Sequence, residues 1–405
     1  MVAEDSAAEF DCGTTLRRWW AFAGLMLFGA TWKLWTPQSE FPQVPLFGWA
    51  GSLPLFVDWL AFGVLLGALA TIAWRPSASR IWLAFACALS VLIMVDQHRL
   101  QPWAWQLLLM AAVFTTPPAR LLRVLTVSIY FWSAVSKFDA SFFASHGQTL
   151  VEALFQSVGL NAAAWPASVK WWLAFALPIG ELLVAVGLCW PRTRRAALIA
   201  ATALHVGLLL ALGPTGLGHR PGVLLWNIAF IGHDWLLFGA RTSDVSQVTR
   251  SVSEGVTPPN TFTPSLTLRV TLIGFACVWP ITERWGLCDR WLAWSVYSTQ
   301  NERVGVTLTD EGARRLPESA RRFAVDGELW LDRWSLAALE VPIYPQLRFQ
   351  LGVVEWLRQR CGEEHLVEVS VQHSERDGGL IERLTVAECD ERRRSFGINT
   401  QPRSR

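Results

Sequence analysis

The stretch LFVDWLAFGVLLGALATIAW, residues Leu55–Trp74, is twenty residues long and almost entirely apolar. A helix of about 20 residues spans the hydrocarbon core of a bilayer, which is about 30 Å thick. The stretch therefore predicts a membrane-spanning helix. Eight more apolar segments predict further spans, at Trp19–Leu34, Ile81–Val95, Trp103–Thr115, Leu121–Lys137, Trp171–Trp190, Ala196–Leu212, Val223–Phe238 and Leu268–Ile281.

The expected fold is an α-helical integral membrane protein with about nine transmembrane or membrane-buried helices in residues 19–282, after a cytoplasmic tail at 1–18. The third, fourth and last predicted spans are short, so re-entrant or buried segments are the alternative for them. The composition agrees with this class, because 52% of the 405 residues are hydrophobic and only 17% are charged. The 24 tryptophans point the same way, since tryptophan concentrates at bilayer interfaces, and membrane lipid is the expected surrounding.

Several functional classes find no support in the sequence. The formal net charge of +2 is too small to indicate a nucleic-acid partner. The seven cysteines have no metal-ligand spacing, so no metal is predicted. Motifs for nucleotide hydrolysis, zinc proteolysis and α/β-hydrolase chemistry are also missing from the chain.

Basic residues mark every second connection between the predicted spans. They are Arg17/Arg18, Arg75/Arg80, Arg120/Arg123, Arg192/Arg194/Arg195 and Arg241/Arg250. Cytoplasmic loops carry the excess of Lys and Arg in membrane proteins. With nine spans, this alternation predicts a cytoplasmic N-terminus and a periplasmic C-terminal region, as in a bacterial inner-membrane protein.

The chain changes character after Pro280, where residues 283–390 are expected to form a small extramembrane α+β domain. Arg303–Thr309 and Leu366–His373 alternate with a period of two, which predicts half-buried strands, whereas Pro345–Cys361 has helical spacing. One disulfide among Cys288, Cys361 and Cys389 is compatible with an oxidising compartment. The basic segment 391–405 has few apolar residues and is expected to be a disordered tail.

The stretch IYFWSAVSKFDASFF, Ile129–Phe143, ends a predicted span on a lysine and an aspartate. Ser133 and Tyr130 lie one and two turns before Lys137, so a polar stripe leads to the amine. Removing water from around an ammonium lowers its pKa and favours a neutral amine able to act as a base. Lys137 is therefore a candidate catalytic residue. The alternative is a lysine that extends to the interface from a helix end.

Two further polar groups are candidates. Asp96, His98 and Arg99 follow the third span, where His98 would support a developing charge and Asp96 would fix its tautomer, or all three form an ordinary polar loop. Glu181 and His205 lie within predicted spans, where ionisable residues are costly and often functional. They would pair to relay protons or bind a polar ligand, or form a structural hydrogen bond.

The stretch IYFWSAVSKFDASFFASHGQTL resembles the helix-end motif of the vitamin K-dependent gamma-carboxylase superfamily and its bacterial HTTM-domain relatives. The matching positions are Tyr130, Phe131, Lys137, Phe138, Asp139 and Gly147. The resemblance implies that Lys137 deprotonates a lipid-soluble, vitamin K-like hydroquinone and leads to quinol-dependent epoxidation or carboxylation. DQHRLQPWAWQ, Asp96–Gln106, is similar to the family's polar turn, which implies an assisting role for His98. Substrate contacts are then expected from Tyr130, Ser133, Asp139, Arg99, Glu181 and His205.

Other functions remain open at this stage. The helix ending in lysine is also similar to DoxX/MauE-type membrane proteins, which are associated with redox or quinone processes. A non-catalytic membrane scaffold would instead use the C-terminal domain to bind a protein partner. A transporter using Glu181 and His205 is a third alternative.

Overall fold

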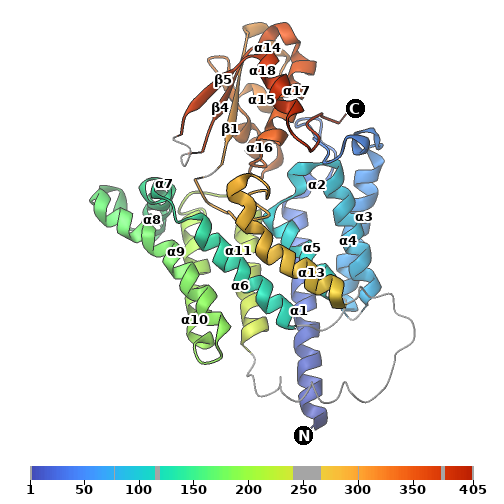
Figure 1. Ribbon diagram of the computed structural model, residues 1–405, viewed down its shortest axis with the longest axis vertical. Helices are drawn as coiled ribbons and strands as arrows, with labels where there is room; N and C mark the ends of the chain where they lie inside the picture. Colours follow the sequence, from blue (N-terminus) through green and yellow to red (C-terminus); the bar gives the residue numbers. More distant parts are fainter. Residues whose placement is uncertain are drawn as a thin grey trace.

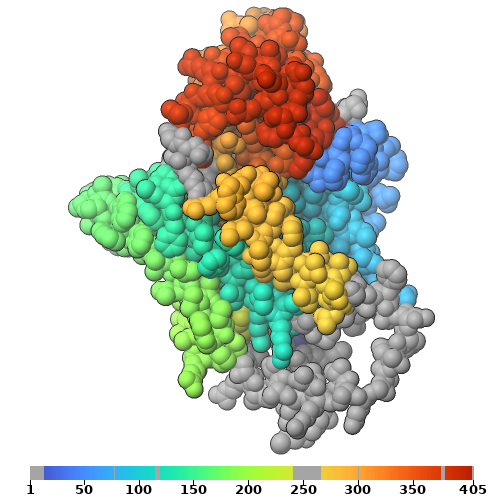
Figure 2. Space-filling model, viewed as in Figure 1, coloured from blue at the N-terminus to red at the C-terminus, as the bar shows by residue number. Residues whose placement is uncertain are grey.

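The computed structural model describes residues 2–76, 78–114, 119–239, 266–299, 301–374 and 379–403. Figure 1 shows a helical region below and a mixed α/β region above it, with the N-terminus at the end farthest from the α/β region. Figure 2 shows the α/β region seated on the helical region, with α13 lying across the front face of the helices.

Each of the nine predicted spans coincides with a helix. The first helix begins at Val2, so the predicted N-terminal tail is part of it. The corresponding helices are α1 (Val2–Ala30), α3 (Phe56–Trp74), α4 (Ser79–Val95), α5 (Pro102–Phe114), α6 (Ala119–Ser136), α9 (Ala167–Cys189), α10 (Arg194–Leu212), α11 (Pro221–Phe238) and α13 (Leu266–Val278).

Fewer of these helices are long enough to cross a bilayer by themselves. Within the described ranges, four pass on length and composition: α3, α9, α10, and α13 together with the 3-10 helix η5 (Trp279–Trp285). A fifth span results if α6 and the segment Ala140–Ser157, bent by 73°, count as one. Helices α4 and α5 are apolar but shorter. The membrane character expected from the sequence therefore agrees with the structure, whereas nine full crossings are not confirmed.

Short helices connect the long ones. Asp139 stops α6 from continuing, because its backbone is extended and its carboxylate accepts a hydrogen bond from Ser141 N at 2.9 Å. Gly147 then lets the chain turn tightly against α9, since a Cβ there would lie 2.7 Å from Ala174 Cβ. The connecting elements are α2 (Trp32–Trp35), η1 (Gly48–Ser52), η2 (Gln97–Arg99), α7 (Ala140–Ala144), α8 (His146–Ser157) and η3 (Ala162–Ala164).

The C-terminal region contains the expected α+β structure. Its antiparallel sheet has the order β2-β3-β1-β4-β5. The strands are β1 (Arg303–Leu308), β2 (Ala324–Val325), β3 (Glu328–Trp330), β4 (Leu366–Gln372) and β5 (Ile381–Leu384). The helices are α14 (Asp310–Arg315), α15 (Glu318–Arg321), α16 (Leu331–Leu339), α17 (Leu347–Cys361), η6 (Glu363–His365) and α18 (Val386–Arg394).

The predicted strands and the predicted helix of this region are confirmed as β1, β4 and α17. Alternate residues of β1, Val304 and Val306, are fully buried, as the period of two requires, and α17 packs against β1 and β4. Cys288, Cys361 and Cys389 are buried and free. The disulfide considered from the sequence is therefore not formed.

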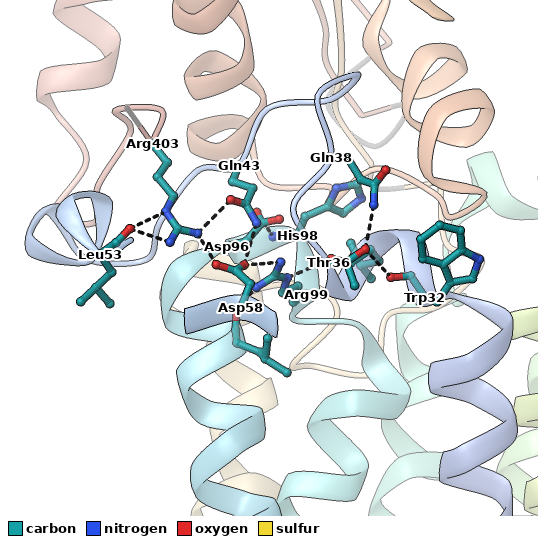
Figure 3. A network of polar contacts seen from close by, with 12 residues as sticks. Trp32, Thr36, Gln38, Gln43, Leu53, Asp58, Asp96, His98, Arg99 and Arg403 are labelled. Atoms are coloured by element: carbon teal, nitrogen blue, oxygen red, sulfur yellow. Dashed lines mark hydrogen bonds and ion pairs between the residues drawn. The ribbon is translucent and has the colours of Figure 1, made fainter. Parts of the chain in front are cut away.

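The prediction of a disordered tail from residue 391 is wrong for the residues described, up to 403. Helix α18 continues to Arg394, and Arg393 Nη1 lies 2.6 Å from Glu355 Oε2. The chain then returns to the helical region, where Arg403 Nη1 lies 2.6 Å from Asp58 Oδ2 (Figure 3). Low apolar content misled the prediction, because ion pairs rather than hydrophobic burial hold this segment.

Candidate functional site

Helix α6 carries a polar stripe into the helical region. Thr126, Tyr130, Ser133 and Lys137 follow each other at intervals of four, three and four residues, which is the spacing of one helix face. Helix α6 packs against α9 and α11, and Thr126, Tyr130 and Lys137 are buried. The stripe therefore faces other helices.

Lys137 is held by an ion pair with Glu181 of α9. Its Nζ lies 3.0 Å from Glu181 Oε2 and 3.1 Å from Oε1, and it also donates to Ser133 Oγ at 2.7 Å. The two charged side chains are only 4% and 10% exposed. Lys137 therefore turns back along its own helix and does not extend outward as an interfacial lysine would. Glu181 pairs with Lys137 and not with His205.

A pocket opens beside this ion pair. Its empty space is about 530 Å³ with the open side included. The walls are mainly apolar and aromatic, with a few convergent polar groups, which is typical of small-molecule sites. The lining residues are Ile129, Tyr130, Ser133, Lys137, Glu181, Leu204, His205, Leu208, Trp226, Asn227, Phe230, Trp294, Val296 and Tyr297.

The segment 294–297, between η5 and β1, forms one wall of the pocket. Trp294 and Tyr297 have backbone φ angles of 61° and 60°. A positive φ is unfavourable for a bulky side chain and marks local strain, which clusters at functional sites. Trp294 is fully buried, and among the described residues its indole N–H has no hydrogen-bond partner. An unused buried donor at the wall of a pocket fits a ligand that offers an acceptor.

A second polar group borders the same pocket. The Tyr130 hydroxyl lies 2.7 Å from His205 Nε2 and 2.6 Å from Asp234 Oδ2. His205 Nδ1 is 2.8 Å from Asn227 Oδ1. Helices α6, α10 and α11 each contribute to this group, which therefore depends on how the helices pack and not on any local motif.

Asp96 and His98 lie in a different environment, between α4 and the C-terminal region (Figure 3). Asp96 Oδ1 accepts the backbone N–H of His98 at 3.1 Å, and His98 Nε2 lies 3.0 Å from the carbonyl oxygen of Pro342. The His98 ring packs against Phe41 and Phe349, at centroid distances of 5.6 and 5.0 Å. Burial lowers the pKa of His98 to about 4 and raises the pKa of Asp96 to about 7.

Arg99 belongs to this second environment too. Its Nη2 lies 2.6 Å from Asp58 Oδ1, and Arg403 approaches the other oxygen of the same carboxylate at 2.6 Å. Gln43 hydrogen-bonds to both Asp58 and Arg403 (Figure 3). We call Asp58, Asp96, His98, Arg99 and Arg403 the junction cluster, because it joins the helical region to the C-terminal region.

The structure thus divides the residues that the sequence singled out. The pocket is lined by five of them: Lys137, Tyr130, Ser133, Glu181 and His205. Asp139 caps α7, and Asp96, His98 and Arg99 belong to the junction cluster, outside the pocket lining. His98 and Lys137 were expected at one membrane face, but they do not meet in one cavity.

Sequence reasoning missed several residues that line the pocket or lie directly behind its lining. Asp234 had a signal, because it is a carboxylate inside the predicted span Val223–Phe238. Asn227 had a weaker one, as a polar side chain in the same span. Trp294 and Tyr297 had none, since they lie in an irregular segment far along the chain.

Among the described residues, no group of three or more His, Cys, Asp or Glu side chains is arranged to hold a metal ion. No family model matches the chain, and no curated protein and no solved structure is significantly similar to it.

Proposed function

We propose that this protein is a membrane enzyme that binds a lipid-soluble hydroquinone in the Lys137 pocket and removes a proton from a ring hydroxyl. The observation that carries the proposal is the buried Lys137–Glu181 ion pair facing a largely apolar pocket. Ion pairs buried for stability alone are usually enclosed by protein on all sides. This pair instead borders empty space that a ligand would fill.

The pocket walls suit a planar ring. Trp226, Phe230 and Tyr130 supply aromatic surface, and aromatic rings favour offset or edge contacts with one another. The free indole N–H of Trp294 offers a hydrogen bond to a ring oxygen.

The ion pair has the composition needed to accept a proton. When the Nζ proton passes to Glu181, the neutral amine of Lys137 is free to take a proton from a ring hydroxyl. The ring O–H bond breaks, an N–H bond forms, and Glu181 holds the displaced proton. The products are a phenolate, an ammonium beside it and a neutral carboxyl group, so no net charge is created in the apolar pocket. The ammonium that forms beside the phenolate stabilises its negative charge where water is excluded.

The resemblance to the gamma-carboxylase superfamily supports the same step. Tyr130 and Lys137, two residues of the shared motif, both line the pocket. Deprotonation is common to epoxidation and carboxylation, so the proposal stops at that step. His98 is not assigned to it, because it lies in the junction cluster.

A location in the bacterial inner membrane, with the C-terminal region in the periplasm, is part of the proposal. The connection between α9 and α10, which carries Arg192, lies at the end of the helical region opposite the C-terminal region (Figure 1). Basic connections favour the cytoplasmic side. The pocket residue Lys137 follows the end of α6, near the α7 helix on the other side.

The test is quinol chemistry with matched lysine variants. Purified protein in lipid nanodiscs is given vitamin K hydroquinone under oxygen, and epoxide formation and oxygen consumption are measured. Lys137→Met and Glu181→Gln are expected to abolish both signals. Lys33→Met is the control, because Lys33 forms a half-exposed ion pair with Glu340 outside the pocket. Equal rates of epoxide formation and oxygen consumption in Lys137→Met and the unmodified protein would overturn the proposal.

A scaffold function has its own supporting observation. The C-terminal sheet has a groove with about 1150 Å³ of empty space, its open side included, whose lining includes the charged residues Glu328, Glu368 and Arg383. A protein partner bound there would be lost on Arg383→Glu, with quinol chemistry unaffected. Retention of all cellular function in Lys137→Met together with its loss in Arg383→Glu would favour the scaffold over the enzyme.

A further inference from the structure

We propose that the hydrogen-bonded side chains of Asp234, Tyr130 and His205 hold one extra proton, beyond those of an ionised carboxylate, a neutral tyrosine and a neutral imidazole. We call these three residues the proton triad, and they form the second acid–base group of the pocket. Its existence follows from hydrogen-bond geometry alone. Its role toward a ligand rests on the proposed function.

The orientation of Asn227 fixes the proton on one side of His205. Asn227 Nδ2 donates to the carbonyl oxygen of Val223 at 2.9 Å, so Asn227 presents its oxygen to His205. An amide oxygen only accepts hydrogen bonds. His205 Nδ1 must therefore carry a proton, and in a neutral imidazole Nε2 is then an acceptor.

Tyr130 then faces two acceptors with a single proton. Its hydroxyl oxygen lies 2.7 Å from His205 Nε2 and 2.6 Å from Asp234 Oδ2, and both distances are those of short hydrogen bonds. One hydroxyl cannot donate to both. A neutral imidazole and an ionised carboxylate would leave one of these contacts without a proton, with two lone pairs facing each other.

One additional proton satisfies both contacts, in either of two arrangements. In the first, Asp234 is protonated and donates to Tyr130, which donates to His205. In the second, His205 is an imidazolium that donates to Tyr130, which donates to an ionised Asp234. Two short proton shifts through the tyrosine oxygen convert one arrangement into the other.

The surroundings of Asp234 favour an uncharged carboxyl group. Asp234 is 1% exposed, and its second oxygen, Oδ1, is buried with no hydrogen-bond partner in the part of the chain that the structure describes. No ion pair with Asp234 occurs among the same residues. An isolated buried carboxylate is strongly unfavourable. An extra proton held within the proton triad lowers the free-energy cost of burying Asp234.

A neighbouring histidine shows what the absence of an extra proton looks like. The indole N–H of Trp20 donates to His233 Nδ1 at 2.9 Å, so Nε2 carries the proton of the neutral ring. Nε2 donates to Thr126 Oγ1 at 2.8 Å, and the Thr126 hydroxyl donates to the Leu122 carbonyl at 2.8 Å. Each of these hydrogen bonds has its own proton, and no extra proton is needed. The extra proton is therefore a feature of the proton triad and not of the neighbouring His233 network.

The proton triad can donate a proton to a ligand in the same pocket in which the Lys137–Glu181 ion pair accepts one. Tyr130 and His205 line the pocket together with Lys137 and Glu181, whereas Asp234 lies behind them. Toward a ligand oxyanion, the Tyr130 O–H bond breaks as the ligand O–H bond forms. The proton of Asp234 moves onto the tyrosine oxygen at the same time and leaves an ionised carboxylate. Tyr130 is thus the group in contact with ligand, and Asp234 positions and restores its proton.

The extra proton can be measured without any ligand. Infrared spectra of the purified protein at neutral pH are recorded for unmodified protein, Asp234→Asn and Glu181→Gln, and ¹⁵N NMR reports the protonation of His205. We expect either a carboxylic-acid band that Asp234→Asn removes and Glu181→Gln retains, or two protonated ring nitrogens at His205. An ionised Asp234 together with a neutral His205 overturns the proposal. His233 is the internal reference for a neutral ring.

The role toward a ligand is tested with menadiol, a short soluble naphthohydroquinone. In Asp234→Asn the new amide donates to Tyr130 and preserves the contacts, but it cannot release a proton. Menadiol should still bind. The rate at which its oxyanion regains a proton should fall about 100-fold, within the usual range for general acid catalysis. An unchanged rate overturns the role as an acid. If deprotonation of menadiol did not depend on Lys137, the proposed function would be rejected, whereas the spectroscopic evidence for the extra proton would be unaffected.

Discussion

The Lys137 pocket and the junction cluster both bury charged side chains, but different groups complete them. In the junction cluster, Asp58 has a guanidinium on each of its oxygens, and the C-terminal region supplies Arg403 for the second. In the pocket, Lys137 and Glu181 satisfy each other and border empty space. Burial of charged side chains alone therefore does not indicate a catalytic or binding site. A site needs charge that protein leaves accessible to a ligand.

The largest expected effect is on the activity of the pocket. Glu181→Gln keeps the shape of the side chain but cannot accept the proton that Lys137 must lose. Quinol turnover should fall about 100-fold or more, as for loss of a general base. Oxygen consumption with vitamin K hydroquinone measures it. The melting temperature should fall less than in Asp58→Ala, because the new amide oxygen still accepts a hydrogen bond from Lys137 and the amine can become neutral, whereas two buried guanidinium groups cannot. An equal loss of stability in the two variants would contradict this contrast between the regions.

The junction cluster should respond in stability and not in chemistry. Asp58→Ala leaves Arg99 and Arg403 buried without their counter-charge, and removing one partner of a buried pair costs about 3–5 kcal/mol. Thermal unfolding in detergent measures the loss. The fraction that remains folded should bind menadiol with unchanged affinity, whereas weakened binding would mean that the cluster belongs to the site. Lys33→Met again provides the exposed-pair control, with an expected loss below about 1 kcal/mol.

The pH dependence of the junction should separate into two opposing parts. His98 has a pKa of about 4 in the folded protein, against 6.5 for an unperturbed histidine, so its contribution to stability is lost as the pH falls from 6.5 to 4. Asp96 has a pKa of about 7 against 3.8, so its contribution is lost as the pH rises from 3.8 to 7.

Two variants should expose the opposite slopes. In His98→Gln the contribution of His98 is removed, so the melting temperature relative to the unmodified protein should fall as the pH rises from 4 to 6.5. In Asp96→Asn the contribution of Asp96 is removed, so the same difference should rise as the pH rises from 3.8 to 7. The full effect is about 3 kcal/mol for His98 and about 4 kcal/mol for Asp96, at about 1.4 kcal/mol per pKa unit. Slopes of the same sign in both variants would contradict this account of the junction.

The smallest effect is expected at the inner end of the polar stripe on α6. Thr126→Val removes the acceptor of the His233 N–H, which costs about 1–3 kcal/mol when a buried donor loses its partner. Neither quinol turnover nor the protonation of His205 should change. Chemical denaturation and ¹⁵N NMR check the two statements. A change at His205 would show that the stripe acts as one unit and not as a structural and a chemical half.

The sequence was sufficient for the helices and for one side of the site. Apolar segment length located the helices, and the rule that intramembrane ionisable residues are costly selected Lys137, Glu181 and His205. It was not sufficient for their partners. Hydropathy gives a residue's depth in the membrane but not its lateral position, so His98 was placed with Lys137 although it packs under the C-terminal region. Arg403 was missed because only tertiary structure brings it to Asp58.

The contact between Asp58 and Arg403 also has a consequence for biosynthesis. The two residues are separated by 345 positions, so Asp58 and Arg99 are synthesised long before Arg403 is. Until then one carboxylate oxygen of Asp58 lacks its second guanidinium, and the loop at Leu53 lacks the donors that Arg403 provides. A chain truncated before Arg403 therefore keeps Asp58 with one guanidinium instead of two, and its junction stays incomplete.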